Sequence, residues 1–199
     1  MKYEREYELT YPDKEPRERV ISDTPRARLK MVRAFRRAAD AAPENMLIHG
    51  DNLPTLKALL EMKEAGGLEN TDGSRGARLV YIDPPFSTRL VFRSKNDRKA
   101  YDDRISGARF IEFLRKRLIL LREFLSADGS IYVHLDWKKA HYVKAVLDEV
   151  FGAENFLNDI VWSYGGRGAK HIASQFSRNH DIILWYRKGG NHVFNRIFA

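Results

Sequence analysis

The chain has 199 residues, of which 43% are hydrophobic, 12% aromatic and 31% charged, so it is long enough to bury the core of about one domain. It contains no cysteine, which excludes disulfide frameworks, cysteine-ligated zinc, iron–sulfur clusters and thiol catalysis. Lysine and arginine number 35 and aspartate and glutamate 27, and the resulting net charge of +8 favours polyanionic partners or, equally, a solvated basic surface.

The N-terminal 44 residues differ in character from the rest of the chain. They are polar and include several prolines, and between positions 26 and 37 they carry six basic residues and no acidic one. We predict a basic N-terminal arm over residues 1–44, extended at first and ending in a short basic helix before Pro43. That helix presents either a solvated face or a surface that contacts phosphates.

Short apolar runs alternate with helical patterns from residue 45 onward. Residues 46–51 predict a strand that ends in a Gly-Asp turn, and the leucines that follow recur at helical spacing until Gly66. Residues 78–82 form a compact run in which the apolar residues, 79–82, are continuous, which is typical of a strand covered on both faces. Residues 85–108 predict a long, polar and basic loop.

The second half of the chain repeats this alternation of elements. It predicts a helix with one apolar stripe over residues 110–125, a strand over 131–136, and a helix that ends at Gly152. Two further strands are expected over residues 159–164 and 181–186. Strands that alternate with helices of this length predict crossover connections, a largely parallel sheet and an α/β fold.

The most informative segment follows the apolar run at residues 78–82. In parallel α/β sheets, ligands bind outside the carboxyl ends of the strands, and Asp83-Pro84-Pro85-Phe86 stands at such an end. The prolines fix φ and remove two backbone donors, so nearby carbonyls are held as rigid acceptors. A carboxylate, these carbonyls and an aromatic ring match a planar group that bears an amine, such as the edge of adenine. The alternative is an ordinary Asp-Pro loop start.

The sequence LVYIDPPF at residues 79–86 resembles the catalytic motif of amino-group DNA methyltransferases. These enzymes transfer a methyl group from S-adenosylmethionine to the exocyclic amine of adenine or cytosine. Gly50-Asp51-Asn52-Leu53 resembles the segment that precedes this motif in the β-type, circularly permuted enzymes, and later blocks follow in the right order up to about residue 190. The chain is thus similar to adenine-specific β-type enzymes, including the modification subunits of type III restriction-modification systems.

The resemblance implies roles for particular residues. Asp83 and Pro84 would hold the target amine, with Pro85 stiffening the turn and Phe86 stacking on a base flipped out of the duplex. Asp51 and Asn52 would face the cofactor, S-adenosylmethionine. The basic residues of the following loop are candidates for contacts with DNA phosphates, the alternative being a solvated loop: Arg89, Arg93, Lys95, Arg98 and Lys99. No metal is expected, because His134, His171 and His180 lack the spacing of metal ligands.

One family feature is absent from the sequence. The chain has no Phe-x-Gly-x-Gly loop, which in this family cradles the methionine end of the cofactor. We therefore expect residues 45–199 to form a partial methyltransferase catalytic domain: an incomplete Rossmann-like sheet without most of its cofactor-binding half. Such an N-terminal fragment would bind S-adenosylmethionine weakly or not at all, and would expose apolar sheet surface.

The function implied is site-specific methylation of the 6-amino group of adenine in double-stranded DNA, as part of a restriction-modification system. The expected partners are DNA and either a restriction subunit or a complementing C-terminal half. Because no apolar run approaches the ~20 residues of a membrane span, we expect a cytoplasmic location without membrane contact. Two alternatives stay open: methylation of the cytosine 4-amino group, which the motif's Asp disfavours, and a catalytically silent nucleic-acid-binding fragment.

Overall fold

The computed structural model describes residues 7–34, 45–85, 91–93, 99–102, 107–165 and 179–196, with the backbone alone for 91–93 and 99–102. These residues form four helices, a single 3-10 turn and six strands. In chain order the elements are α1 (Arg17–Asp23), α2 (Asn52–Glu64), β1 (Ala77–Ile82), β2 (Val91–Arg93), β3 (Lys99–Asp102), α3 (Ala108–Phe124), β4 (Leu125–Asp136), α4 (Ala140–Phe151), η1 (Ala153–Asn155), β5 (Phe156–Ser163) and β6 (His180–Arg187).

The main sheet has the strand order β1-β4-β6-β5. β1 pairs in parallel with β4, whereas β6 pairs antiparallel with both β4 and β5. β1, β4 and β5 therefore run in one direction, and α3 and α4 lie in the connections between them, as crossover units require. The predicted α/β fold with a largely parallel sheet is confirmed, with β6 as its antiparallel strand.

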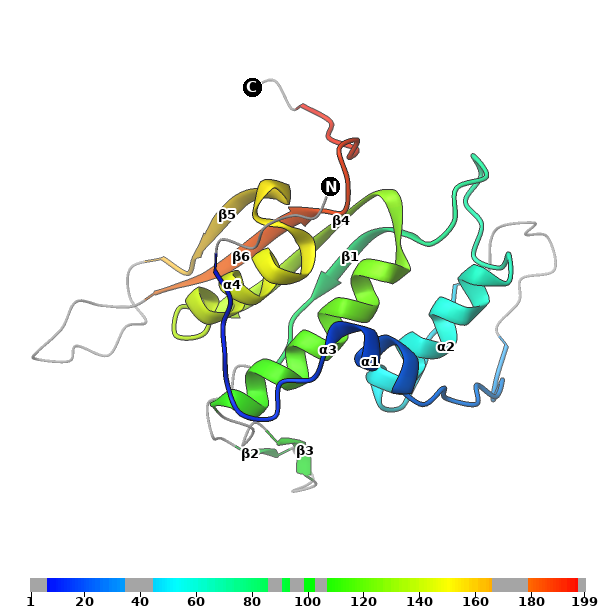
Figure 1. The fold of residues 1–199 in the computed structure, drawn as a ribbon, viewed down its shortest axis with the longest axis horizontal. Helices are drawn as coiled ribbons and strands as arrows, with labels where there is room; N and C mark the ends of the chain where they lie inside the picture. The colour runs from blue at the N-terminus through cyan, green and yellow to red at the C-terminus, as the bar shows by residue number, and fades with distance from the viewer. Residues whose placement is uncertain are drawn as a thin grey trace, which may run out of the picture.

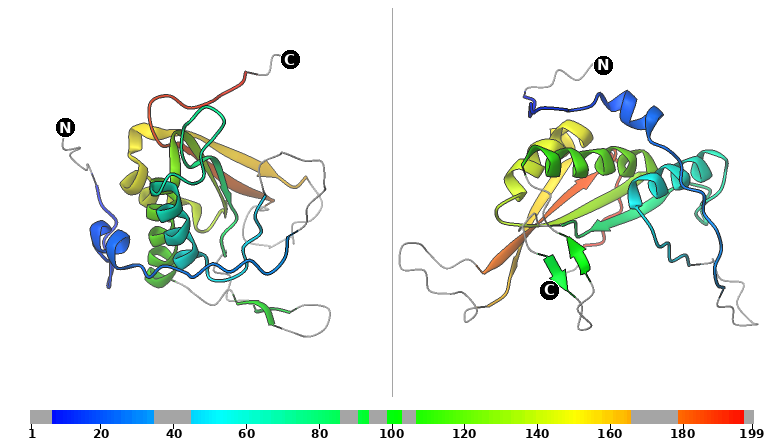
Figure 2. Two further views of the ribbon diagram at one scale, coloured as in Figure 1. Left: turned by 90° about the vertical axis from the view of Figure 1, so that its right-hand side faces the viewer. Right: turned by 90° about the horizontal axis from the view of Figure 1, so that it is seen from below.

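All four described helices lie on one face of this sheet (Figure 1 and Figure 2). The core fills the space between them and the sheet, where Ile131, Leu135 and Tyr186 are fully buried. On the opposite face, Leu79 and Tyr81 of β1 are 62% and 52% exposed. The prediction that this strand is covered on both faces is therefore wrong for the described residues, because no helix among them crosses to that face.

Two local predictions are also wrong, for residues 46–50 and for residues 85–108. Residues 46–50 form no strand, and Leu47 is fully exposed, because the described chain offers no neighbouring strand to pair their backbone groups. Residues 26–34 are not helical, and residues 35–44, where the short basic helix before Pro43 is expected to end, lie outside the described residues. The expected loop over residues 85–108 contains an antiparallel pair, β2 and β3.

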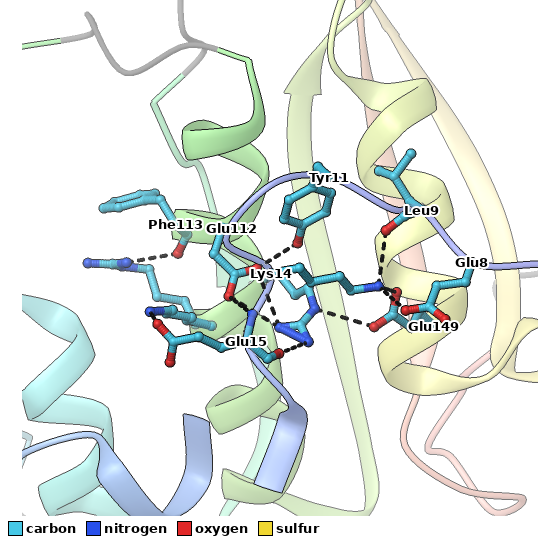
Figure 3. A network of polar contacts seen from close by, with 11 residues as sticks. Glu8, Leu9, Tyr11, Lys14, Glu15, Glu112, Phe113 and Glu149 are labelled. Carbon is cyan, nitrogen blue, oxygen red and sulfur yellow. Dashed lines mark hydrogen bonds and ion pairs between the residues drawn. The ribbon is translucent and has the colours of Figure 1, made fainter. Parts of the chain in front are cut away.

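Residues 7–16, here called the N-terminal strap, run across the outer side of α3 and α4 (Figure 3). The Tyr7 hydroxyl donates to Asp148 of α4 at 2.5 Å, and the Tyr11 hydroxyl donates to Glu112 of α3 at 2.6 Å. Lys14 pairs with Glu149 of α4 at 2.6 Å. The strap thus joins two helices that are separate in the chain. The polar side chains of Tyr7, Tyr11 and Lys14 bind carboxylates of these helices. The division at residue 44 stays a prediction.

Arg115 of α3 lies at the centre of these contacts and is 2% exposed. Its guanidinium donates to the carbonyl oxygen of Glu15 at 2.6 Å and pairs with Glu149 at 3.3 Å and Glu112 at 3.4 Å. Buried charges are tolerated only when they are paired, so this network depends on its single arginine.

We expect Arg115→Met to lower the free energy of unfolding by about 3 kcal/mol, because Glu112 and Glu149 would stay buried with less compensating charge. Urea unfolding measures the change. The matched control is Arg19→Met, since Arg19 pairs with Asp23 on the exposed side of α1 and should alter stability by less than about 0.5 kcal/mol. Equal stabilities of the two variants would contradict a structural role for the strap network.

Two lysines meet at the C-terminal end of α3. Lys63 donates to the carbonyl oxygens of Glu123 and Leu125 at 2.6 and 2.8 Å, and Lys188 donates to the same two oxygens at 3.2 and 2.6 Å. Cations are favourable at this end of the helix dipole, but the two ammonium groups repel each other. Burial, and then the charge of Lys63, lower the pKa of Lys188 to about 8.

This shift predicts a pH dependence of stability. Between pH about 8 and the ordinary lysine pKa of 10.5, the unfolded chain binds a proton at Lys188 that the folded chain has released. The free energy of unfolding contributed by Lys188 therefore increases as the pH rises through this range. We expect the difference in unfolding free energy between the wild type and Lys188→Met to grow in favour of the wild type from pH 8 to 10.5. A difference that is constant with pH would refute the assignment.

Candidate active site

Asp83 directly follows β1, at the carboxyl end of the strand. Its side chain is exposed and forms no hydrogen bond or ion pair with the described part of the chain, while Pro84 and Pro85 are half-buried. The carboxylate is therefore not engaged in a structural salt link and can accept hydrogen bonds from a ligand. Phe86, the last residue of the predicted motif, lies outside the described residues.

A polar row crosses the open face of the sheet beside Asp83. The Tyr81 hydroxyl lies 2.9 Å from Nδ1 of His134, and Nε2 of His134 lies 3.0 Å from Oδ2 of Asp181. Because a carboxylate can only accept, Nε2 carries a proton. The row links the neighbouring strands β1, β4 and β6 at the end of the sheet where Asp83 lies.

Further carboxylates share this edge. Asp136 is the last residue of β4, and Asp181, which is opposite it, is the second residue of the antiparallel strand β6, so both stand near Asp83. Desolvation, a hydrogen bond with Asp181 and then the charges of Asp181, Asp136 and Asp83 raise the pKa of Tyr164 to about 12. Burial, followed by the charges of Asp83 and Asp181, also raises the pKa of Tyr81. Burial raises the pKa of Asp136, and the nearby charges of Lys138 and Lys139 oppose that shift. The carboxylates at this edge suit a group that develops positive charge.

Asp51 and Asn52 stand at the start of α2. Oδ1 of Asp51 caps the helix by accepting from the backbone N–H of Leu53 at 2.9 Å. Figure 1 shows that α2 begins at the end of the sheet where β1 ends. Both side chains are exposed, and Oδ2 of Asp51 and Nδ2 of Asn52 have no partner within the described chain. An acceptor and a donor thus stand in adjacent residues.

Arg117 of α3 contacts both predicted cofactor-binding residues, a link that the sequence patterns did not reveal. Its guanidinium donates from Nε to Oδ1 of Asn52 at 2.6 Å and from Nη2 to Oδ1 of Asp51 at 3.1 Å. Burial lowers the pKa of Arg117, and Asp51 opposes that shift. The available signal was a basic residue inside a helix with a long apolar stripe, where a buried charge needs a partner.

Of the five predicted DNA-binding residues, two lie in the described backbone. Arg93 ends β2 and Lys99 begins β3, at directly opposed positions of the pair. Arg89, Lys95 and Arg98 lie outside the described residues, as does His171. Within the residues that the structure does describe, no three acidic or histidine side chains are grouped as metal ligands. Nor does that part of the chain hold a helix long and apolar enough to cross a membrane.

Comparisons with known proteins converge on one family. The type II methyltransferase M.EcaI of Enterobacter cloacae is 32% identical over 94% of this chain, and the probable type III restriction-modification enzyme HindVI Mod subunit of Haemophilus influenzae is 31% identical over 82%. This chain spans 39% of the first relative's length and 20% of the second's. The crystal structure of the M1.HpyAVI–SAM complex aligns at a TM-score of 0.48 and 14% identity, covering 76% of this chain and 59% of that one.

A family model described as DNA methylase matches residues 77–197. The match begins with β1, includes Asp83 and the carboxylates of β4 and β6, and extends beyond β6. The resemblance seen in the sequence is thus confirmed, although the roles assigned to individual residues stay predictions. The chain belongs to the DNA methylase family.

Proposed function

We propose that this chain supplies the base-binding part of a methyltransferase that methylates the 6-amino group of adenine in double-stranded DNA. The observation that carries the proposal is the unpaired carboxylate of Asp83, held before two prolines at the carboxyl end of β1. Membership of the DNA methylase family supports the reaction class. The Asp at this position favours adenine over cytosine as the target base.

The residues of this edge have the chemistry that the reaction requires. A carboxylate oxygen of Asp83 and the carbonyl of Pro84 can each accept one hydrogen of the target amine, which directs the nitrogen lone pair away from them. Asp136 and Asp181 add negative charge that stabilises the positive charge developing on that nitrogen. S-adenosylmethionine, when bound, supplies a methyl group already activated by a positive sulfur. No strong base is then needed, and alignment at about 3–3.5 Å is the main requirement.

Asp51 and Asn52 fit a polar edge of the cofactor. The free oxygen of Asp51 can accept from a hydroxyl or amino group, and the free amide of Asn52 can donate to an adjacent oxygen or ring nitrogen. Ribose hydroxyls and the adenine edge of S-adenosylmethionine both present such pairs. Because the sequence lacks the Phe-x-Gly-x-Gly loop, we expect binding by these residues to be weak.

The β2–β3 pair supports contact with the DNA backbone. Arg93 and Lys99 belong to a segment with several basic residues, which suits contact with phosphates. We therefore retain these residues, with Arg89, Lys95 and Arg98, as candidates for phosphate contacts. Type II and type III relatives favour a restriction-modification system in the cytoplasm, with a restriction subunit or a complementing C-terminal half as partner.

The proposal predicts that Asp83→Ala lowers methyl transfer to DNA by at least about 10²-fold, because one preorganised acceptor is lost. The assay mixes the chain with a C-terminal half of M.EcaI, DNA and S-adenosylmethionine carrying a tritiated methyl group. Asp23→Ala, which removes an exposed carboxylate at the end of α1, should leave the rate unchanged.

The identity of the product separates the alternatives. Mass spectrometry of the digested DNA should show N6-methyladenine. Finding 4-methylcytosine instead would show that the target base is cytosine and not adenine. DNA binding that weakens steeply with salt, without any transfer, would favour the silent binding fragment. Transfer that survives Asp83→Ala would refute the role of Asp83.

A further inference from the structure

We propose that Arg117 is a positioning residue that holds Asp51 and Asn52 in the orientation that contacts the cofactor. The inference rests on the proposed function, because it assumes that these two residues face S-adenosylmethionine. The geometry behind it is a single guanidinium that reaches both side chains, with Nη2 on Asp51 at 3.1 Å and Nε on Asn52 at 2.6 Å.

The guanidinium is itself fixed from the other side. Its Nη1 donates to the carbonyl oxygen of Phe113 at 2.8 Å, and its central carbon lies 3.5 Å from the centre of the Phe113 ring. The Arg117 side chain is 10% exposed, whereas that of Asp51 is 64% exposed. A rigid buried fork on α3 therefore orients Asn52, whose side chain has no other partner within the described chain, and adds a second contact to Asp51, which already caps α2.

The orientation has a chemical consequence for both groups. Arg117 and the backbone N–H of Leu53 both use Oδ1 of Asp51, which leaves Oδ2 available as an acceptor. Arg117 uses Oδ1 of Asn52, so the amide of Asn52 must present its NH₂ group outward. Without the arginine, Asn52 could flip and offer an acceptor where the proposed site needs a donor.

Stability alone does not require an arginine at this place. A buried ion pair is often no more stabilising than well-packed apolar residues of similar volume, so a methionine could fill the same space. The polar groups that Arg117 joins are exposed, and Asp51 already caps α2 through Leu53. Orientation of Asp51 and Asn52 is therefore the effect that depends specifically on the fork of Arg117.

The test compares Arg117→Met with the matched control Arg122→Met, which removes an arginine elsewhere on α3. Titration of the purified chain with S-adenosylmethionine gives the dissociation constant, and thermal unfolding verifies that each variant is folded. We expect Arg117→Met to weaken binding between about 10- and 100-fold, as Asp51→Asn does, and Arg122→Met to have no effect. Because Arg117 is proposed to act through Asp51, the double variant Asp51→Asn/Arg117→Met should bind S-adenosylmethionine no more weakly than Arg117→Met alone.

A second measurement reports orientation without the cofactor. The Asn52 side-chain amide signals in a nitrogen–proton correlation spectrum, assigned by their loss in Asn52→Asp, should shift and lose order in Arg117→Met but not in Arg122→Met. If Arg117→Met does not fold, Arg117→Lys serves instead, because it keeps the charge but cannot reach both side chains. We expect it to disturb the Asn52 signals in the same way.

The outcomes distinguish the inference from the proposed function. If Asp51→Asn weakens binding and Arg117→Met does not, the positioning role is refuted and the proposed cofactor contact stands. If neither variant affects binding, or if the wild-type chain does not bind at millimolar concentration, the cofactor contact is refuted and the inference falls with it. Unchanged Asn52 signals in a folded Arg117→Met variant would also overturn the inference.

Discussion

The packing of α3 against the sheet is the constraint on which the other parts of the molecule depend. α3 is the connection that makes β1 and β4 parallel, and it contacts α1, α2 and α4 as well. It is buried on most of its surface, so that even Arg115 and Arg117 are 2% and 8% exposed. Each of these arginines joins a different segment to the core. Arg115 binds the N-terminal strap, and Arg117 binds the start of α2.

The elements that local patterns specify could be predicted from the sequence. The apolar stripe and Gly152 placed α4, the continuous run at residues 78–82 placed β1, and the motif that follows placed Asp83 at a strand end. These features need only neighbouring residues, because periodicity and turn chemistry act over a few positions. The same motif also pointed to the family.

The features that escaped prediction depend on contacts between distant residues. Residues 46–50 have the composition of a strand but no described partner to pair with, and β1 has an open face because the described helices all lie opposite. Arg117 becomes a site residue only when α2 and α3 pack together, which no spacing within either helix shows. The polar row through His134 likewise needs three strands in register.

The net charge of the whole chain and the carboxylates near Asp83 have opposite signs. The chain as a whole carries +8, which favours approach to a polyanion over distances near the Debye length. The edge around Asp83 instead gathers carboxylates, because these follow or end adjacent strands. The proposed function uses both: long-range attraction for the phosphate backbone, and short-range acceptors for one amine.

The N-terminal strap has a consequence for the order in which the protein is made. Tyr7 leaves the ribosome well before its hydrogen-bond partner Asp148, which lies 141 positions later in the chain. The strap cannot dock until α4 has been synthesised, so its charged groups remain hydrated while the crossover units assemble. Contacts of such long sequence separation form late and slow the folding reaction. Closing of the strap is therefore expected to follow the formation of the crossover units that contain α3 and α4.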